Sequence, residues 1–254
     1  AKFRRDLVLK NLLENNYINK KDYAKFIDKK IKLKKIKKIF SEDSKYYVED
    51  IRKDVIDKFG YDNVYRQGLN INTPINLKFQ KIATQSLREG LVSYDMRRGW
   101  RGPVQKNKNI NNWINGLEDF RLEQSINWDL AMIMKINKFN VEIETEKKLK
   151  GIIKYENISW TKKEFSELFN IGDVVYVKNI SDNLFALKQL PDVNGGIVVM
   201  DPFTGRVLAL SGGFSFKKSE FNRATQALRQ PGSAFKPFIY ALALESGYTP
   251  STLI

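Results

Sequence analysis

The chain has 254 residues and contains no histidine and no cysteine, which excludes several classes of enzyme. Without imidazole or thiol groups it has no Ser-His-Asp triad, no cysteine nucleophile and none of the usual zinc or iron–sulfur ligand sets. Acid–base chemistry must therefore use lysine, tyrosine or carboxylates, and we expect neither a metal ion nor a cofactor.

The formal net charge is +15, and residues 1–40 alone hold 14 basic and 4 acidic side chains. We favour a solvated lysine-rich surface over an anionic membrane or polymer as the explanation. No stretch approaches the roughly 18 consecutive apolar residues that cross a membrane, and the start does not resemble a signal peptide. We therefore expect a piece of a longer protein whose membrane anchor lies outside these residues.

Apolar residues at helical spacing predict several helices before residue 97. Helices are expected from about Leu7, over residues 22–27, and from Ser41 to a stop at Gly60. Residues 65–73 are expected to be extended, because Pro74 follows them. A longer helix is predicted from Ile75 to about Tyr94, with four apolar residues facing inward: Ile75, Phe79, Ile82 and Leu87.

A breaker-rich run at residues 97–103 ends this helical pattern. Residues 113–133 are predicted to be helical, and short strands are predicted after them, over 140–145, 149–155, 173–179 and 184–190. Such short strands, separated by turns, indicate a small barrel or sandwich.

Two further apolar runs, 196–201 and 206–210, predict a β-hairpin with turn residues between them. The break Gln230-Pro231-Gly232 follows later, and a helix is predicted from Ser233. Phe238, Ala241 and Leu242 would form the apolar side of that helix.

Ser233-Ala234-Phe235-Lys236 is the candidate reaction centre. Residues three apart lie on one face of a helix, and Pro237 indicates that Ser233 stands at the N-terminal end, where the helix dipole favours an alkoxide. A desolvated Lys236 would serve as the base. Ser159 and Ser215 also begin Ser-x-x-Lys patterns, but neither has a Pro-Gly break before it or an apolar helix after it. From the pattern alone, an N-capping serine beside a solvated lysine is the alternative.

Residues 223–240, with Gly212-Gly213 and the hairpin before them, resemble the transpeptidase domain of class A penicillin-binding proteins. Residues 4–9 resemble the end of that family's glycosyltransferase domain, residues 67–91 its interdomain linker, and residues 94–103 the start of the OB-like insert of its 1A branch. The resemblance implies a multidomain α+β chain. Its segments would be a glycosyltransferase remnant (1–45), a linker (46–96), an OB-like domain (97–192) and the N-terminal part of the transpeptidase domain (193–254).

The resemblance also implies that Ser233 attacks the stem pentapeptide of peptidoglycan, that Lys236 is its base, and that β-lactams acylate Ser233. The parent protein would lie at the periplasmic face of the bacterial inner membrane. That family completes its site with downstream Ser-x-Asn and Lys-Thr/Ser-Gly elements, which this chain lacks, so we expect the isolated chain to be inactive. No glycosyltransferase residue can be assigned.

Two alternative functions concern the OB-like segment. As a docking module it would bind a cell-envelope partner, which the resemblance implies to be an outer-membrane lipoprotein activator. Nucleic-acid binding is disfavoured, because single-strand binding uses arginine and aromatic residues on the strands, and residues 140–190 contain no arginine. We therefore expect no nucleic-acid partner.

Overall fold

The computed structural model describes residues 2–30, 41–106 and 108–253. Its contacts divide the chain into two units, residues 1–40 and 41–254, which are described separately. Most of the basic run that follows Lys29 lies outside the described residues. In the part of the chain that the structure describes, no helix combines the length and the apolar character needed to cross a membrane.

The first unit contains helices α1 (Lys2–Glu14) and α2 (Lys20–Ile27). The Asn19 side chain caps α2 by accepting a 2.8 Å hydrogen bond from the Asp22 amide, as asparagine does at helix starts. Arg5 joins the two helices, because its guanidinium donates a 2.7 Å hydrogen bond to the Ile27 carbonyl. Neither helix has a buried residue. The two predicted helices are confirmed.

The second unit opens with a 3₁₀ turn (Glu42–Ser44) and helix α3 (Lys45–Phe59). Gly60, at φ +79°, ends α3 as predicted. Helix α4 (Tyr61–Arg66) follows directly, so the expectation of an extended segment from residue 65 is wrong at its start. Helix α5 (Leu77–Met96) is capped by Asn76, whose side chain accepts hydrogen bonds from the amides of Lys78 and Phe79.

The face that α5 buries differs from the prediction. Phe79 and Ile82 are 41% and 52% exposed, whereas Gln80 and Ala83 are buried. The Gln80 amide both donates to and accepts from the backbone of Leu210, each at 2.9 Å. A buried amide must satisfy its hydrogen bonds, and here that pairing, together with the small side chain of Ala83, decides the orientation of α5.

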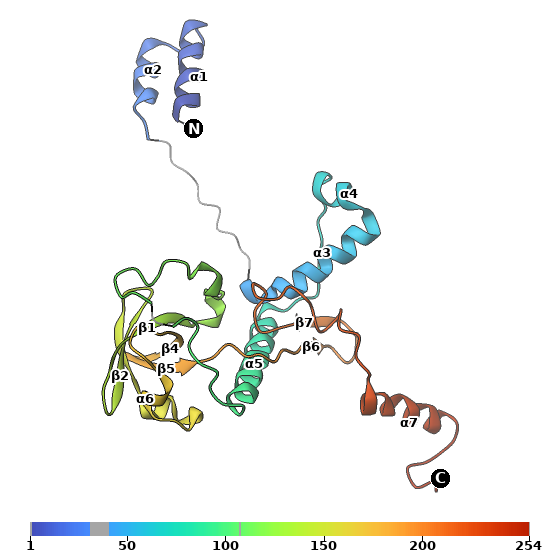
Figure 1. Ribbon diagram of the computed structural model, residues 1–254. Helices are drawn as coiled ribbons and strands as arrows, with labels where there is room; N and C mark the ends of the chain where they lie inside the picture. Colours follow the sequence, from blue (N-terminus) through green and yellow to red (C-terminus); the bar gives the residue numbers. More distant parts are fainter. Residues whose placement is uncertain (1, 31–40, 107, 254) are drawn as a thin grey trace. The chain divides into compact units, whose positions relative to one another are not determined.

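Five strands form a closed barrel in the order β1-β2-β3-β5-β4 (Figure 1). All neighbours are antiparallel except β3 and β5. Helix α6 (Phe165–Leu168) lies in the connection from β3 to β4. The four strands predicted between residues 140 and 190 are confirmed. The barrel strands are β1 (Asp129–Ile136), β2 (Asn140–Thr145), β3 (Lys150–Lys154), β4 (Val174–Ser181) and β5 (Leu184–Lys188).

The helix predicted over residues 113–133 is wrong. Two 3₁₀ turns (Glu118–Phe120 and Gln124–Ile126) occupy its middle, and Asp129 begins β1. Leu130 and Met132 of β1 pack in one apolar cluster, while Ala131 and Ile133 pack in the barrel core. A strand buried on both faces has a continuous apolar run, which periodicity cannot distinguish from a buried helix.

The predicted hairpin is confirmed as strands β6 (Ile197–Met200) and β7 (Val207–Ser211), which pair antiparallel. Asp201 orders its turn by accepting hydrogen bonds from the Phe203 amide and the Thr204 hydroxyl. Helix α5 lies against this hairpin (Figure 1). The chain is thus a mixed α+β molecule with helices, a five-stranded barrel and a separate hairpin.

Helix α7 (Lys236–Glu245) follows a 3₁₀ turn (Gly232–Phe235). The predicted helix therefore exists, although its α-helical part begins three residues later than Ser233. Phe238 and Leu242, expected on its apolar side, are 67% and 61% exposed. No residue of α7 is buried among the described residues.

Candidate functional site

Ser233 and Lys236 lie at the junction of a 3₁₀ turn and helix α7. Pro231 and Gly232, at φ +55°, turn the chain into this junction. The Lys236 amide donates a hydrogen bond to the Ser233 carbonyl. Because residues i and i+3 eclipse in a 3₁₀ turn, the two side chains start from the same side of the backbone. Pro237 is accommodated in the first turn of α7, where no amide hydrogen is needed.

The surroundings of this junction differ from the desolvated environment predicted for Lys236. Ser233 and Lys236 are both exposed. Within the described residues, neither side chain makes a hydrogen bond or an ion pair. The described chain therefore brings the two residues together through the backbone, but it does not bury them.

The segment before the junction is anchored to α3. Asp50 accepts hydrogen bonds from the Thr225 hydroxyl at 2.7 Å and from the Asn222 amide group at 3.3 Å. Gly212 allows Asn222 to approach closely, since a Cβ at Gly212 would stand 2.6 Å from the Asn222 Cα. At Gly213 a Cβ would stand 2.3 Å from the Tyr46 hydroxyl. Gly212-Gly213 thus permits close packing at the end of the hairpin.

Ser215, the nucleophile position of another Ser-x-x-Lys pattern, has a structural role. It is buried, and its hydroxyl donates a 2.6 Å hydrogen bond to the Glu123 carboxylate. The Lys217 amide donates to the other Glu123 oxygen at 2.7 Å. Burial raises the pKa of Glu123, but these hydrogen bonds outweigh it, so that its pKa lies below the usual range. The ammonium group of Lys218 donates a hydrogen bond to the Asp119 carbonyl.

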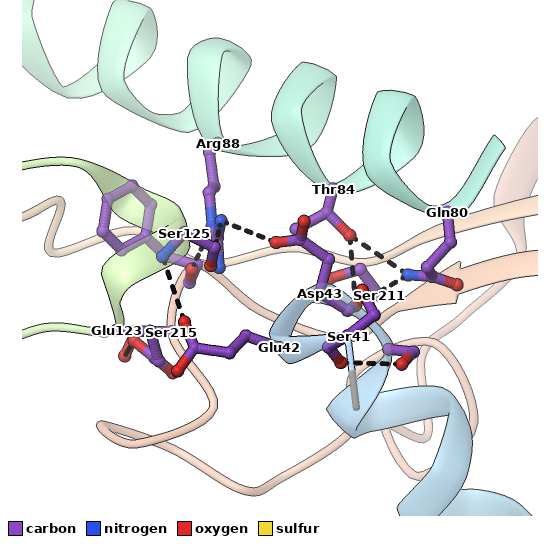
Figure 2. A network of polar contacts seen from close by, with 12 residues as sticks. Ser41, Glu42, Asp43, Gln80, Thr84, Arg88, Glu123, Ser125, Ser211 and Ser215 are labelled. Atoms are coloured by element: carbon purple, nitrogen blue, oxygen red, sulfur yellow. Dashed lines mark hydrogen bonds and ion pairs between the residues drawn. The ribbon is translucent and has the colours of Figure 1, made fainter. Parts of the chain in front are cut away.

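Arg88 of α5 is the centre of the polar network drawn in Figure 2. Its guanidinium donates to the Phe214 carbonyl at 2.9 Å and to the Ser125 hydroxyl at 3.1 Å, and it pairs with Asp43 at 3.1 Å. Glu42 accepts a hydrogen bond from the Ser125 amide. Through these contacts the start of the unit, α5, the segment before β1 and the segment after β7 are held together.

A second polar cluster joins the end of α5 to the segments before and after the barrel strands. The Asp95 carboxylate is almost fully buried and accepts hydrogen bonds from Arg101 at 2.9 Å, Gln189 at 2.8 Å and the Asp192 amide at 3.1 Å. Arg101 and Gln189 are also joined, from the Arg101 amide to the Gln189 side-chain oxygen at 2.8 Å. Burial raises the pKa of Asp95, but the hydrogen bonds from Arg101 and Gln189 leave it below its usual value. The segments leading into and out of the barrel are therefore fixed to the end of α5.

Sequence analysis missed both polar clusters. Helical spacing places Gln80, Thr84 and Arg88 on one face of α5, and this was the only available signal. Their partners are far away in the sequence, and no local pattern specifies them.

Known proteins are similar to the chain over its whole length. The penicillin-binding protein OB-like domain family matches residues 100–193, and the penicillin-binding protein transpeptidase domain family matches residues 195–254. Penicillin-binding protein 1A of Rickettsia bellii (strain RML369-C) is 37% identical over 258 residues, covering 100% of this chain and 32% of that protein. Penicillin-binding protein 1A of Escherichia coli (strain K12) is 29% identical, covering 99% of this chain and 31% of that protein.

The crystal structure of penicillin-binding protein 1A from Haemophilus influenzae has the same fold. It matches with a TM-score of 0.75 and 32% sequence identity, over 100% of this chain and 38% of that chain. Barrel, hairpin and matched families together define a multidomain protein in which an OB-like domain precedes part of a transpeptidase domain.

The chain belongs to the penicillin-binding protein 1A family. It spans about a third of the length of the curated relatives it matches. The segment boundaries expected at residues 45, 96 and 192, and the roles of Ser233 and Lys236, stay predictions.

Proposed function

We propose that this chain supplies the nucleophile and the base of a D,D-transpeptidase that cross-links peptidoglycan stem peptides. One observation carries the proposal. Ser233 and Lys236 stand three residues apart at a 3₁₀ turn, between a Pro-Gly break and an apolar helix, within the segment that the transpeptidase family matches.

In the proposed reaction, the Ser233 Oγ attacks the carbonyl carbon of the penultimate D-Ala of a stem pentapeptide. Lys236 accepts the hydroxyl proton, the amide bond to the terminal D-Ala breaks, and that D-Ala leaves with the proton on its amine. An amine from a neighbouring stem then attacks the acyl-enzyme ester, and the ester bond to the Ser233 Oγ breaks as the cross-link forms. Lys236 takes the proton of the amine and returns it to the Ser233 Oγ. β-Lactams would acylate Ser233 in the same way, because their strained amide takes the place of the D-Ala amide.

The 254 residues do not contain the whole proposed site. The Ser-x-Asn and Lys-Thr/Ser-Gly elements that complete it in the resembling family do not occur downstream of Lys236. Donors that stabilise the oxyanion contribute about 10²-fold to 10³-fold to rate. We therefore expect the 254-residue chain by itself to be inactive.

A chimaera tests the assignment of the nucleophile. Residues 1–254 replace the aligned residues of the Haemophilus influenzae protein, whose remaining residues complete the domain. The purified chimaera is incubated with fluorescent penicillin, and the label is mapped by peptide mass spectrometry. We expect the label on Ser233, its loss in Ser233→Ala, and full labelling in the matched control Ser159→Ala, which changes an exposed serine of another Ser-x-x-Lys pattern.

Labelling that persists in Ser233→Ala would refute the assignment. A second chimaera carries only residues 195–254 and keeps the OB-like domain of the Haemophilus influenzae protein. Labelling of Ser233 is tested in it in the same way. Intact labelling of both chimaeras in the Lys236→Ala variant would refute the role of Lys236 as the base.

We further propose that the parent protein also polymerises glycan strands and lies at the periplasmic face of the inner membrane. The resemblance of residues 4–9 to the end of a glycosyltransferase domain supports this. An activity assay on lipid-linked substrate with the protein encoded by the complete gene would test it. Absence of polymerisation would refute it.

A second candidate function is docking of an outer-membrane lipoprotein activator on the OB-like domain. The supporting observation is that the barrel has a core of its own, which includes Ile133, Ile153 and Phe185. In the full-length protein, deletion of residues 97–192 should abolish partner-stimulated cross-linking but preserve β-lactam acylation. Acylation is the necessary control, because the deletion also removes Glu123 from Ser215. Unchanged stimulation would end this proposal.

A further inference from the structure

A cleft of about 460 Å³ lies between helix α5 and the barrel. Lys81 and Arg88 of α5 line it, as do Lys178 of β4 and Lys188 of β5. Trp128, whose ring lies 5.4 Å from that of the buried Phe214, lines the cleft as well. None of its lining residues belongs to the junction that carries Ser233 and Lys236.

The polar clusters already described fix the walls of this cleft. Arg88 ties the middle of α5 to Ser125 and Phe214, which both line the cleft. Asp95 ties the end of α5 to the barrel, next to Met96, another lining residue. Because α5 is attached at two places along its length, the cleft exists before any ligand arrives, as small-ligand sites usually do.

Lys178 and Lys188 lie close together on one face of the sheet. Lys178 pairs in register with Ala186, two residues before Lys188, so the two lysines are diagonal neighbours on one face of the sheet. Among the described residues, neither lysine side chain makes a hydrogen bond or an ion pair. Burial, and then the charge of Lys178, lower the pKa of the Lys188 ammonium group.

The carboxylates that line the cleft already have partners. Asp43 is paired with Arg88 at 3.1 Å, and Glu89 accepts a 2.8 Å hydrogen bond from the Gln85 side chain. Neither of them neutralises the lysine pair. An anion that enters from outside would therefore relieve the repulsion between Lys178 and Lys188, and it would do so in a partly desolvated place where a charge-assisted hydrogen bond is strong.

The rest of the lining favours a peptide over other anions. Trp128, Phe214 and Met96 offer apolar surface that an inorganic anion would not use, while Gln85 and Asn127 offer groups that can pair with a peptide backbone. Single-stranded nucleic acid is disfavoured, because its binding uses arginine and aromatic residues on the strands, and residues 140–190 contain no arginine. The volume suits a segment of a few residues.

We propose that the cleft between α5 and strands β4 and β5 binds a short peptide segment with free carboxylates, which Lys178 and Lys188 receive. This site does not depend on the assignment of Ser233. Binding of the peptide in the cleft should therefore not change when Ser233 is substituted.

Two-dimensional NMR of the indole N–H groups tests the proposal on the ¹⁵N-labelled 254-residue chain. The probe is the acetylated peptide Glu-Ala-Glu-Ala with free carboxylates, and its uncharged counterpart is Gln-Ala-Gln-Ala amide. We expect the Trp128 resonance to shift in a saturable way with the acidic peptide only. The Trp160 resonance should stay in place, because that indole packs against the barrel core. Inorganic phosphate alone should shift neither resonance at the same concentration.

The double variant Lys178→Gln/Lys188→Gln should weaken binding at least about 10-fold. The matched control Lys150→Gln/Lys154→Gln removes the same charge from two exposed lysines of β3, and it should change the affinity less than about 2-fold. Lys188→Arg should retain binding. Lys178→Gln alone changes an exposed residue, so it keeps the test valid if the double variant unfolds.

Three results would overturn the proposal. They are no saturable shift of Trp128, equal shifts with the uncharged peptide or with phosphate, and equal losses in the two double variants. Equal losses in the two double variants would show that the peptide binds through the general positive charge of the chain and not in this cleft.

Discussion

The barrel and the Ser233–Lys236 junction differ in how far their side chains are buried. In the barrel, the side chains of Ile133, Ile153 and Phe185 are almost completely buried. At the junction and along α7, every described side chain is at least partly exposed. The difference shows that the barrel completes its fold with contacts among its own residues, whereas the junction is defined by local backbone geometry. The chemistry proposed for Ser233 needs an environment that the described residues do not form around it.

The same substitution in both regions provides the strongest test of this comparison. Phe185→Ala should lower the free energy of unfolding by about 3–5 kcal/mol, because it opens a cavity in the barrel core. Phe238→Ala in α7 should change it by less than about 0.5 kcal/mol, because Phe238 is largely exposed. Urea denaturation followed by tryptophan fluorescence measures both. Similar losses for the two variants would show that α7 is packed in solution.

This contrast also explains what the sequence could predict. Strands with one buried face, such as β2 with Val141 and Ile143 inward, alternate between apolar and polar residues and were found. Strand β1 is buried on both faces and was mistaken for a helix. The turn around Ser233 was found because Pro231, Gly232 and Pro237 specify the backbone locally.

Long-range polar pairing was not predictable. The orientation of α5 depends on Gln80 and the backbone of Leu210, which are 130 residues apart. Apolar periodicity instead predicts that Phe79 and Ile82 face inward. A periodic pattern of apolar residues cannot indicate that a polar amide is buried because its partner lies far away in the sequence. The exposure of Lys236 was missed for the related reason that burial depends on which segments pack nearby.

The Glu123 contacts should be the next most sensitive feature, because they join the OB-like domain to the segment after β7. Glu123→Ala leaves the Ser215 hydroxyl and the Lys217 amide without their acceptor in a buried place. We expect a loss of about 2–3 kcal/mol in the free energy of unfolding. The control Glu156→Ala, at an exposed site, should cost less than about 0.5 kcal/mol in the same urea denaturation. Equal values would mean that the contacts do not stabilise the chain.

The Asp95 cluster should give a smaller effect. Asp95→Asn keeps the shape but leaves one acceptor oxygen for three donors: Arg101, Gln189 and the Asp192 amide. The expected cost is about 1–2 kcal/mol. Asp192→Asn changes a carboxylate whose side chain is 73% exposed. Its melting temperature in thermal unfolding should therefore be close to that of the unaltered chain. A larger decrease in melting temperature for Asp192→Asn than for Asp95→Asn would show that the Asp95 hydrogen bonds do not hold α5 to the barrel.

The smallest expected effect is the change with pH of the stability that the Glu123 carboxylate contributes. Its pKa in the folded chain lies below the unfolded value of about 4.3, so its charge stabilises the fold above that pH. This contribution is lost as the pH falls through the folded pKa. The stability difference between the unaltered chain and Glu123→Gln should therefore shrink between neutral pH and about pH 3. Denaturation curves at both pH values measure it, and a difference that grows on acidification would be inconsistent with the depressed pKa.

We propose that these residues provide the nucleophile and base of a transpeptidase but not its complete site. The most direct measurement compares the second-order rate constant for acylation by fluorescent penicillin between the 254-residue chain and the chimaera with the Haemophilus influenzae protein. We expect a rate at least about 10²-fold slower for the chain alone, with the chimaera labelled on Ser233. Equal rates for the two proteins, or a label on another residue, would contradict it.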